Sequence, residues 1–351
     1  MPDGEHLVFS ARAPDEASSQ VWMLTYPDGE VRRLTNDLES YFWLSLTSDG
    51  RMLVARQQRI VLHLWLLVDG NLKKARQLTF GERNFDGYAG LAWTPDGKIV
   101  SSIFAGQNTD LYSMNGDGSN RVQLTVNAGR DNTDPVISNG GRYIVFTSNR
   151  SGSRQIWRMD IDGRNQRQLT PGEGQAGSAQ SAALSPGETD VFFIQHRAGT
   201  ASIWRVSIEG GSPVQSPGLT SAVTGGLLSI SPDGKWLAYR HASPGSEARS
   251  EDRTLSIGVM PTDGGGEPKL YDLQMRRPTI QWSGDSASFY YAAGTFDSSS
   301  LWRQTLNGGD PQKLLDFPDR VFNFAWSRDG RNLVVSRGKQ RGDAILITNL
   351  P

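Results

Sequence analysis

The feature that most constrains the fold of this chain is a repeated unit built from short apolar runs. The clearest copy, residues 135–170, holds three runs of four to six residues and a fourth that ends at Leu169-Thr170. Ser-Asn-Gly-Gly, Asn-Arg-Ser-Gly and Asp-Gly separate these runs. Short runs rich in Val, Ile, Phe and Trp, bounded by Gly, Asn and Asp, predict antiparallel strands joined by tight turns. One unit is therefore expected to be a four-stranded meander.

Two sequence markers recur with the unit. A turn that usually is Ser-Pro-Asp-Gly-basic occurs in eight versions, whose fourth positions (4, 50, 97, 141, 188, 234, 286 and 330) are 44 to 52 residues apart. A Leu-Thr pair closes five of the units, at 34–35, 78–79, 124–125, 169–170 and 219–220. A period of this length, built from four short strands, is typical of a β-propeller.

We therefore predict an all-β fold, a β-propeller of four-stranded antiparallel blades. Eight blades are expected, with seven as the alternative. The predicted organisation is a single propeller domain over residues 1–351. Its repeat units are 1–35, 36–79, 80–125, 126–170, 171–220, 221–271, 272–315 and 316–351. Large aromatic residues in the third strand of most units, such as Trp157, are expected to pack blade against blade. Met1 stands where other units have Ser or Thr, so we expect the chain to be cut from a longer protein.

Composition excludes several classes of function. The 36 basic and 37 acidic residues give a net charge of −1 and are evenly spread, which argues against nucleic-acid binding. Cysteine is absent, so neither disulfides nor thiolate metal sites are expected. No apolar run reaches the length of a membrane-spanning helix, and the N-terminus lacks the pattern of a signal peptide.

Catalytic and metal-binding patterns are also missing. There is no Gly-x-Ser-x-Gly nucleophile motif, and only four histidines are present. His196 and His241 follow the second strand of adjacent units and could share a face, but a metal site needs further ligands. We therefore expect no cofactor, no metal and no enzymatic activity. The alternative is a propeller enzyme, a carbohydrate lyase or hydrolase, with its site at the channel mouth.

The stretches SPDGKWLAYR, SNRSGSRQIWRMDIDGRNQRQLT and FAWSRDGRNLVVSRG resemble the TolB-type, WD40-like propeller repeat. The resemblance extends to the C-terminal propeller of bacterial serine/threonine protein kinases and winged-helix regulators, and it covers nearly the whole chain. It implies a sensor or interaction module of a larger signalling protein. If that protein is a membrane-anchored receptor, the module would lie on the extracytoplasmic, periplasmic side. The kinase motifs themselves are absent here, so kinase activity is not assigned to these residues.

The candidate binding residues lie in loops that join the last strand of one unit to the first strand of the next. Exposed Tyr, Phe and Arg on such loops are typical of interaction sites. An alternative role for the aromatic residues is to plug the channel. The expected partner is a protein, a peptide or an anionic glycan. The candidates are Tyr41, Phe85, Asp86, Tyr88, Arg130, Asp131, Arg276, Arg277, Arg320 and Phe322.

Overall fold

The structure of the chain is a computed structural model. It describes residues 1–13, 18–37, 39–81, 85–105, 108–126, 128–171, 177–216, 223–241, 255–273, 279–295, 297–348 and 350. Apart from one short 3-10 turn, η1 (Leu72–Lys74), all regular elements in these residues are β-strands. The predicted all-β class is confirmed. The chain divides into two compact units, which we call the ring unit (Leu62–Gly338) and the terminal unit (Met1–Val61 with Lys339–Pro351). The single domain over 1–351 stays a prediction.

Five consecutive repeats of the ring unit each form a four-stranded antiparallel sheet in chain order. The sheets are β7 (Leu91–Trp93), β8 (Lys98–Ala105), β9 (Asn108–Asn115) and β10 (Val122–Gln123); β11 (Asn132–Ile137), β12 (Tyr143–Ser151), β13 (Ser153–Asp160) and β14 (Arg167–Gln168); β15 (Ser178–Leu184), β16 (Asp190–Arg197), β17 (Thr200–Ser207) and β18 (Val214–Gln215); β19 (Val223–Ile230), β20 (Trp236–His241), β21 (Leu255–Pro261) and β22 (Lys269–Leu273); and β23 (Ile280–Trp282), β24 (Ser288–Gly294), β25 (Ser299–Thr305) and β26 (Gln312–Phe317).

The Ser-Pro-Asp-Gly marker forms the turn between the first two strands of a sheet. In the copy at 231–235, the hydroxyl of Ser231 donates to the Asp233 carboxylate at 2.6 Å and accepts from the Trp236 amide at 3.0 Å. The amide of Gly234 donates to the Ser231 carbonyl at 2.8 Å, and Gly234 has a φ of +75°. Glycine adopts that conformation without strain, which explains its place in the marker.

The Leu-Thr marker fastens the outermost strand to the third strand. The hydroxyl of Thr170 accepts a hydrogen bond from the Ile156 amide at 2.9 Å and donates to the Gln155 side chain at 2.7 Å. Leu169 beside it is buried. The same threonine-to-amide bond recurs at Thr35, Thr79 and Thr125. The marker therefore satisfies buried polar groups that the two-residue outer strand leaves unpaired.

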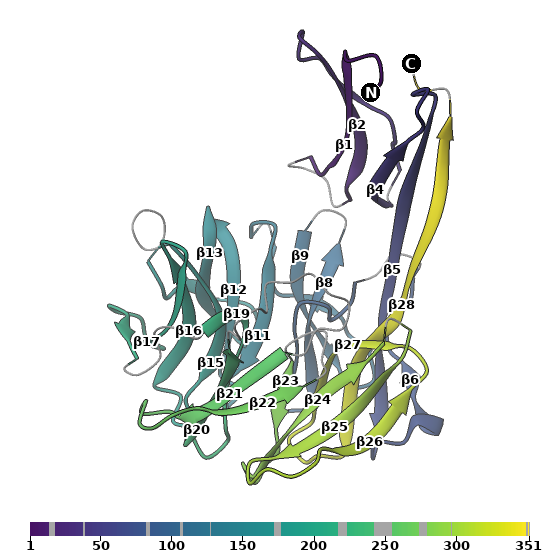
Figure 1. Cartoon of the computed structure of the whole chain (residues 1–351). Coiled ribbons are helices and arrows are strands. Elements are labelled where there is room, and N and C mark those ends of the chain that lie inside the picture. The colour runs from purple at the N-terminus through teal and green to yellow at the C-terminus, as the bar shows by residue number, and fades with distance from the viewer. Residues whose placement is uncertain are drawn as a thin grey trace. The chain divides into compact units, whose positions relative to one another are not determined.

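The sixth sheet of the ring unit combines the two ends of that unit. Its strands are β27 (Arg320–Trp326), the first half of β28 (Asn332–Thr348), the second half of β5 (Met52–Val68) and β6 (Arg76–Gln77). β5 and β28 are each 17 residues long, because each runs straight through the position where other repeats turn from strand two to strand three. Figure 1 shows these two strands side by side.

This pairing corrects the predicted blade count. The second and eighth repeats share one sheet instead of forming a sheet each, so the described strands form seven sheets and not eight. Seven was the alternative count. Six of the seven sheets lie, wholly or in part, in the ring unit.

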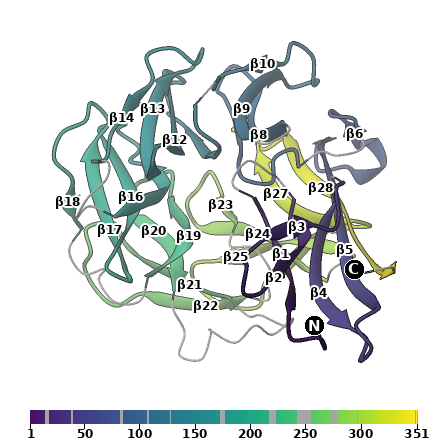
Figure 2. The ribbon, with the colours of Figure 1, turned by 90° about the horizontal axis from the view of Figure 1, so that it is seen from above.

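Six hydrophobic clusters close the ring, one at each junction between neighbouring sheets. Phe146 and Leu111 belong to the cluster between the first two sheets, and Phe193 and Val145 belong to the next. The closing sheet packs on both neighbours. At one of these junctions the indole N–H of Trp93 donates to the Ala325 carbonyl at 3.0 Å. The sheets of the ring unit are therefore arranged around one axis, as the view from above shows (Figure 2). The aromatic marker residues of the third strand, Trp157 among them, are partly buried against these clusters.

The terminal unit contains the remaining strands. β1 (His6–Ala11), β2 (Gln20–Thr25) and β3 (Val31–Arg33) form a three-stranded sheet. β4 (Ser40–Leu46) pairs with the first half of β5. Val21, Tyr41, Leu53 and Ala55 form the buried cluster of this unit.

Candidate functional site

The ring unit has two distinct ends. The first, which we call the loop end, carries the connections from the last strand of one sheet to the first strand of the next. The opposite end, which we call the turn end, carries the turns between the first two strands of each sheet. Apart from Tyr41, the predicted residues that the structure describes belong to the loop end.

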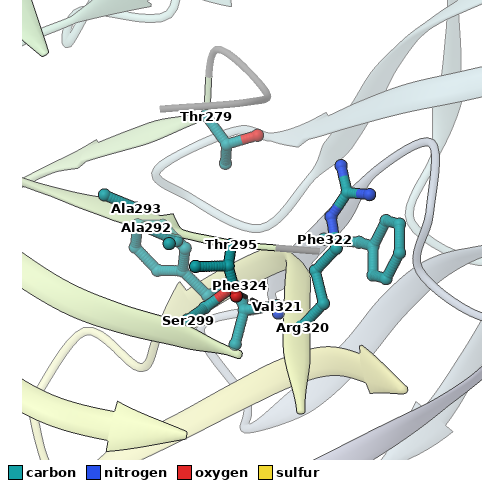
Figure 3. A pocket seen from close by; sticks show the side chains of 10 residues that line it. Thr279, Ala292, Ala293, Thr295, Ser299, Arg320, Val321, Phe322 and Phe324 are labelled. Atoms are coloured by element: carbon teal, nitrogen blue, oxygen red, sulfur yellow. Dashed lines mark hydrogen bonds between the residues drawn. The ribbon is translucent and has the colours of Figure 1, made fainter. Parts of the chain in front are cut away.

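An aromatic cluster at the loop end brings together four of the predicted residues. Tyr88 lies at a ring-centroid distance of 6.0 Å from Phe85 and 5.8 Å from Phe322. Phe104, at the end of β8, joins the cluster at 5.7 Å from Phe85. The guanidinium of Arg320 stands 4.5 Å from the centroid of the Phe322 ring, and its side chain extends beside that ring in Figure 3. Residues far apart in the sequence therefore form one amphipathic patch. Phe322 is only 3% exposed, so it packs within this patch and is not the exposed loop residue that was predicted.

The cavity next to Arg320 is too small for a ligand. Thr279, Ala292, Ser299 and Arg320 are among the residues that line it (Figure 3), and its volume is about 10 Å³. A cavity of that size holds about one water molecule. This cavity therefore does not accommodate a ligand.

Asp86 stands between Phe85 and Tyr88 in the sequence and has no access to solvent. Its side chain is 0% exposed, and neither carboxylate oxygen has a hydrogen-bond partner among the described residues. Burial raises the pKa of the Asp86 carboxyl, and nearby Thr79, Arg121 and His63 act in the opposite direction. The Thr79 hydroxyl is close, but it is not in hydrogen-bond geometry with either oxygen. Asp86 was predicted to face a ligand, and its complete burial contradicts that role.

Arg130 and Asp131 occupy the next loop. The amides of both residues donate to the Asn149 side chain at 3.0 Å, and the Asp131 carboxylate forms an ion pair with Arg154 at 3.1 Å. This pair is largely exposed, so it contributes little to stability. Asp131 is therefore part of a local surface network of its own sheet.

Two arginines and one tyrosine of the predicted set do not contribute to this surface. Arg276 and Arg277 lie outside the described residues. Tyr41 is in the terminal unit, where it is only 2% exposed and its hydroxyl donates to Asp37. Burial raises the pKa of Tyr41 to about 12. The expectation that Tyr41 is an exposed loop residue is wrong, because the residue packs in the cluster of the terminal unit.

Two exposed apolar residues at the loop end were missed by the sequence prediction. Phe80 is 72% exposed and Val126 is 61% exposed. Each directly follows the Leu-Thr marker of its repeat, so the two occupy equivalent positions in adjacent sheets. The signal that could have identified them is the contrast with Asn36 and Pro171, the residues at the same position in other repeats.

The histidines expected on adjacent repeats lie in neighbouring sheets. His196, in β16, is within 3.1 Å of the Gln180 amide, and burial lowers its pKa. His241, in β20, lies with its ring centroid 6.1 Å from that of Tyr239. Over the described part of the chain, no three or more His, Asp or Glu side chains are grouped to hold a metal ion. No described helix is long and apolar enough to span a membrane.

Sequence comparison identifies the type of repeat. A family model described as the TolB beta propeller domain matches residues 82–251. Residues 82–251 are therefore similar to the TolB beta propeller domain, in agreement with the repeat seen in the sequence. The resemblance to kinase propellers and winged-helix regulators stays a prediction.

Two curated relatives match parts of the chain. An uncharacterized protein of Agrobacterium fabrum is 42% identical over 81 residues, which cover 22% of this chain and 27% of that protein. An uncharacterized peptidase of Bacillus subtilis, YuxL, is 27% identical over 115 residues, which cover 32% of this chain and 17% of the peptidase. The matched stretches thus span less than a third of either relative.

Solved structures share the architecture at low sequence identity. A protein described as TolB from Agrobacterium tumefaciens is 18% identical, with a TM-score of 0.60, over 79% of this chain and 98% of that one. TolB from Acinetobacter baumannii is 14% identical, with a TM-score of 0.52, over 97% and 80%. Oligogalacturonate lyase from Vibrio parahaemolyticus is 14% identical, with a TM-score of 0.50, over 77% of each chain. At these identities the likeness establishes the propeller fold alone.

Proposed function

We propose that this chain is a non-enzymatic binding propeller that recognises a protein or peptide at the loop end of its ring unit. The observation that carries the proposal is the pair Phe80 and Val126, two large apolar side chains exposed at equivalent positions of adjacent sheets. Exposed apolar groups that gather at one end of a rigid scaffold mark interaction surfaces. Tyr88 and Arg320, in the amphipathic patch at the same end, are of residue types enriched at binding hot spots.

The charged groups of the loop end favour a polar rim around this surface. Arg130 and Asp131 lie in one loop, where Asp131 pairs with Arg154 of β13, and Arg320 begins β27. Apolar centres with charged rims are typical of protein interfaces, in which the rim governs partner choice more than affinity. The finer role, a sensor in a bacterial signalling protein that reports from the extracytoplasmic side, is part of the same proposal.

The second candidate function is a carbohydrate-active enzyme, which the fold shared with oligogalacturonate lyase brings into consideration. A lyase would need a general base or metal-held group at the channel mouth. Among the described residues, no three or more His, Asp or Glu side chains are grouped to hold a metal ion, and a substrate does not reach the buried Asp86 of the loop end. The binding role is therefore the better supported of the two.

The test compares binding and turnover on one preparation. The purified chain is screened against immobilised peptide and glycan arrays, and oligogalacturonate is incubated with it while unsaturated product is followed by ultraviolet absorbance. The double variant Phe80→Ser/Val126→Ser should lose peptide binding and keep its fold, because surface changes rarely affect stability by more than about 0.5 kcal/mol. The matched control is Val214→Ser, an exposed valine on the outer strand β18.

The expected result is peptide binding by the parent and the control but not by the double variant, without turnover. If the double variant still binds the peptide, the binding site is not at Phe80 and Val126 of the loop end. Steady formation of unsaturated product would instead support the second candidate function, a carbohydrate lyase.

A further inference from the structure

A large hollow opens at the turn end of the ring unit, opposite the loop end. Its volume is about 540 Å³, within the range of sites that hold small ligands. Ile230, Trp282, Tyr290 and Trp326 provide its apolar walls, and Asn139 and Arg328 lie at its rim. These residues come from the first two strands and the connecting turns of four different sheets. The hollow therefore depends on the closed ring and not on one repeat.

Arg328 gives this hollow its charge. Among the described residues that line the hollow, it is the one charged side chain. Arg328 occupies the position of proline in the turn marker, as at Pro95 and Pro232, so the repeat itself does not require an arginine. Its guanidinium donates to the Ser138 carbonyl at 3.3 Å and to the Asn139 side chain at 3.4 Å. Both distances exceed the usual length of about 2.9–3.0 Å, so these bonds to the rim are weak.

The walls of the hollow also contain hydrogen-bond donors without acceptors. The buried indole nitrogens of Trp282 and Trp326 have no partner among the described residues. The equivalent Trp93 satisfies its indole by donating to the neighbouring sheet. A buried donor left unpaired costs about 1–3 kcal/mol. These two indole nitrogens are buried and do not reach the surface of the hollow, so its positive charge comes from the guanidinium of Arg328.

Three further polar side chains of the lining are already engaged. The side-chain amide of Gln281 accepts from the Trp326 amide at 2.6 Å and donates to the Trp326 carbonyl at 3.1 Å. The hydroxyls of Ser283 and Ser327 each donate to an aspartate of their own turn at 2.5 Å. Arg328 is therefore the lining group best placed to recognise a ligand, and it requires an acceptor with negative charge.

We propose that the turn end is a second binding site, for a small ligand that carries a carboxylate on an apolar or flat body. The guanidinium of Arg328 provides a planar fork of donors that matches a carboxylate. Trp326 and Tyr290, whose ring centroids are 5.9 Å apart, provide the surface on which the body packs. This site does not depend on the proposed function of the loop end, because the two share no residues.

Calorimetry with matched acid and amide probes tests this site. The probes are short N-acetylated peptides with a free or an amidated C-terminus, and oligomers of galacturonic acid with their methyl esters. The acids should bind the parent chain, and their amides or esters should bind at least about tenfold more weakly. Which of the two series binds identifies the source of the carboxylate.

The decisive variants are Arg328→Ala and Arg328→Pro. The second introduces the residue found in this turn in other repeats, so it is expected to fold. Either variant should weaken binding of the acid roughly ten- to a hundredfold. Arg331→Ala is the matched control, because Arg331 lies in the same turn but does not line this hollow. A parent that binds no acid better than its amide, or an Arg328→Ala variant that binds like the parent, would overturn the proposal.

Tryptophan fluorescence provides a second readout. Binding in the hollow should change the emission of the parent, and Trp326→Phe should remove most of that change while circular dichroism confirms that the fold is retained. An unchanged response in this variant and in Trp282→Phe, the other tryptophan of the lining, would place the ligand elsewhere. The Phe80→Ser/Val126→Ser variant should bind the acids normally, so a failed turn-end site and a failed loop-end site are distinguishable.

Discussion

Asp86 is expected to destabilise the fold in its charged form, and replacing it with asparagine should stabilise the protein. The carboxylate is fully buried and has no hydrogen-bond partner among the described residues. A buried unsatisfied group costs about 1–3 kcal/mol, and more when it is charged. Asparagine keeps the shape and removes the charge. Asp86→Asn should therefore raise the free energy of unfolding by about 1–3 kcal/mol, or the melting temperature by roughly 2–4 °C per kcal/mol.

Asp110 is the matched control, because it is also buried but its carboxylate is satisfied. It accepts hydrogen bonds from Thr125 at 2.7 Å, from Asn132 at 3.1 Å and from Gln123 at 3.1 Å. Asp110→Asn replaces one carboxylate oxygen, an acceptor, with an amide NH₂ group. This donor would face the donors that now bind the carboxylate. This variant should lower the free energy of unfolding by about 1–3 kcal/mol. The two isosteric substitutions should thus have opposite signs.

The pH dependence of stability provides a second check on the predicted effect of Asp86→Asn. The raised pKa of Asp86 means that the folded state holds this proton more tightly than the unfolded state. The contribution of Asp86 to the free energy of unfolding is therefore fully present below the ordinary pKa of a carboxyl group. It is lost as the pH rises through the raised pKa that Asp86 has in the folded protein. The advantage of Asp86→Asn should therefore be small in acid and large in mildly alkaline buffer. Thermal unfolding followed by circular dichroism measures it, and equal effects of both variants at every pH would refute the reasoning.

Three further predictions concern backbone, core and metals. Gly177→Ala should lower the free energy of unfolding, measured by chemical denaturation, by about 1–3 kcal/mol more than Gly199→Ala does. A Cβ at Gly177 would meet the His196 carbonyl oxygen at 2.0 Å, whereas Gly199, which has a similar positive φ, has open space at that position. Equal losses in the two variants would contradict this. Phe193→Ala should lower the free energy of unfolding by about 3–5 kcal/mol, because Phe193 is 0% exposed in its cluster, and a loss below about 1 kcal/mol would disprove core packing there. A chelator should leave the melting temperature unchanged, and a drop of several degrees would reveal a structural metal and revive the lyase hypothesis.

The repeat unit was predictable from the sequence because its markers have local causes. The turn at Ser231 and the threonine bond at Thr170 are formed by residues close to them in sequence, so each copy reveals its own strand ends. The number of sheets was not predictable in the same way, because it depends on long-range pairing. Residues 56–59, Arg-Gln-Gln-Arg, lack turn formers and allow β5 to run straight. Gly338 and Gly342 suggest a turn in β28, yet this strand continues through both positions and is a neighbour of β5 in one sheet.

The candidate site was predictable only as a set of loops. Sequence position placed Phe85, Tyr88 and Phe322 at one end of the ring, and the structure brings them into contact. Whether a loop residue points outward depends on neighbours from distant repeats. Asp86 is buried where Ser336 of β28 donates to its backbone carbonyl, a contact across 250 positions of the chain. The local sequence around Asp86 carries no sign of that contact.

The shared sheet that closes the ring also determines when the ring can form during synthesis. Two of its strands come from residues 62–77, whereas the other two come from residues 320–338. At ordinary elongation rates, the ribosome needs roughly 10–50 s to make the chain between these two pairs. Until then Leu64 and Leu67, both 0% exposed in the finished ring, lack the strands that bury them. Any chaperone or protease that meets the nascent chain therefore finds an open edge, and the last strand made is the one that removes it.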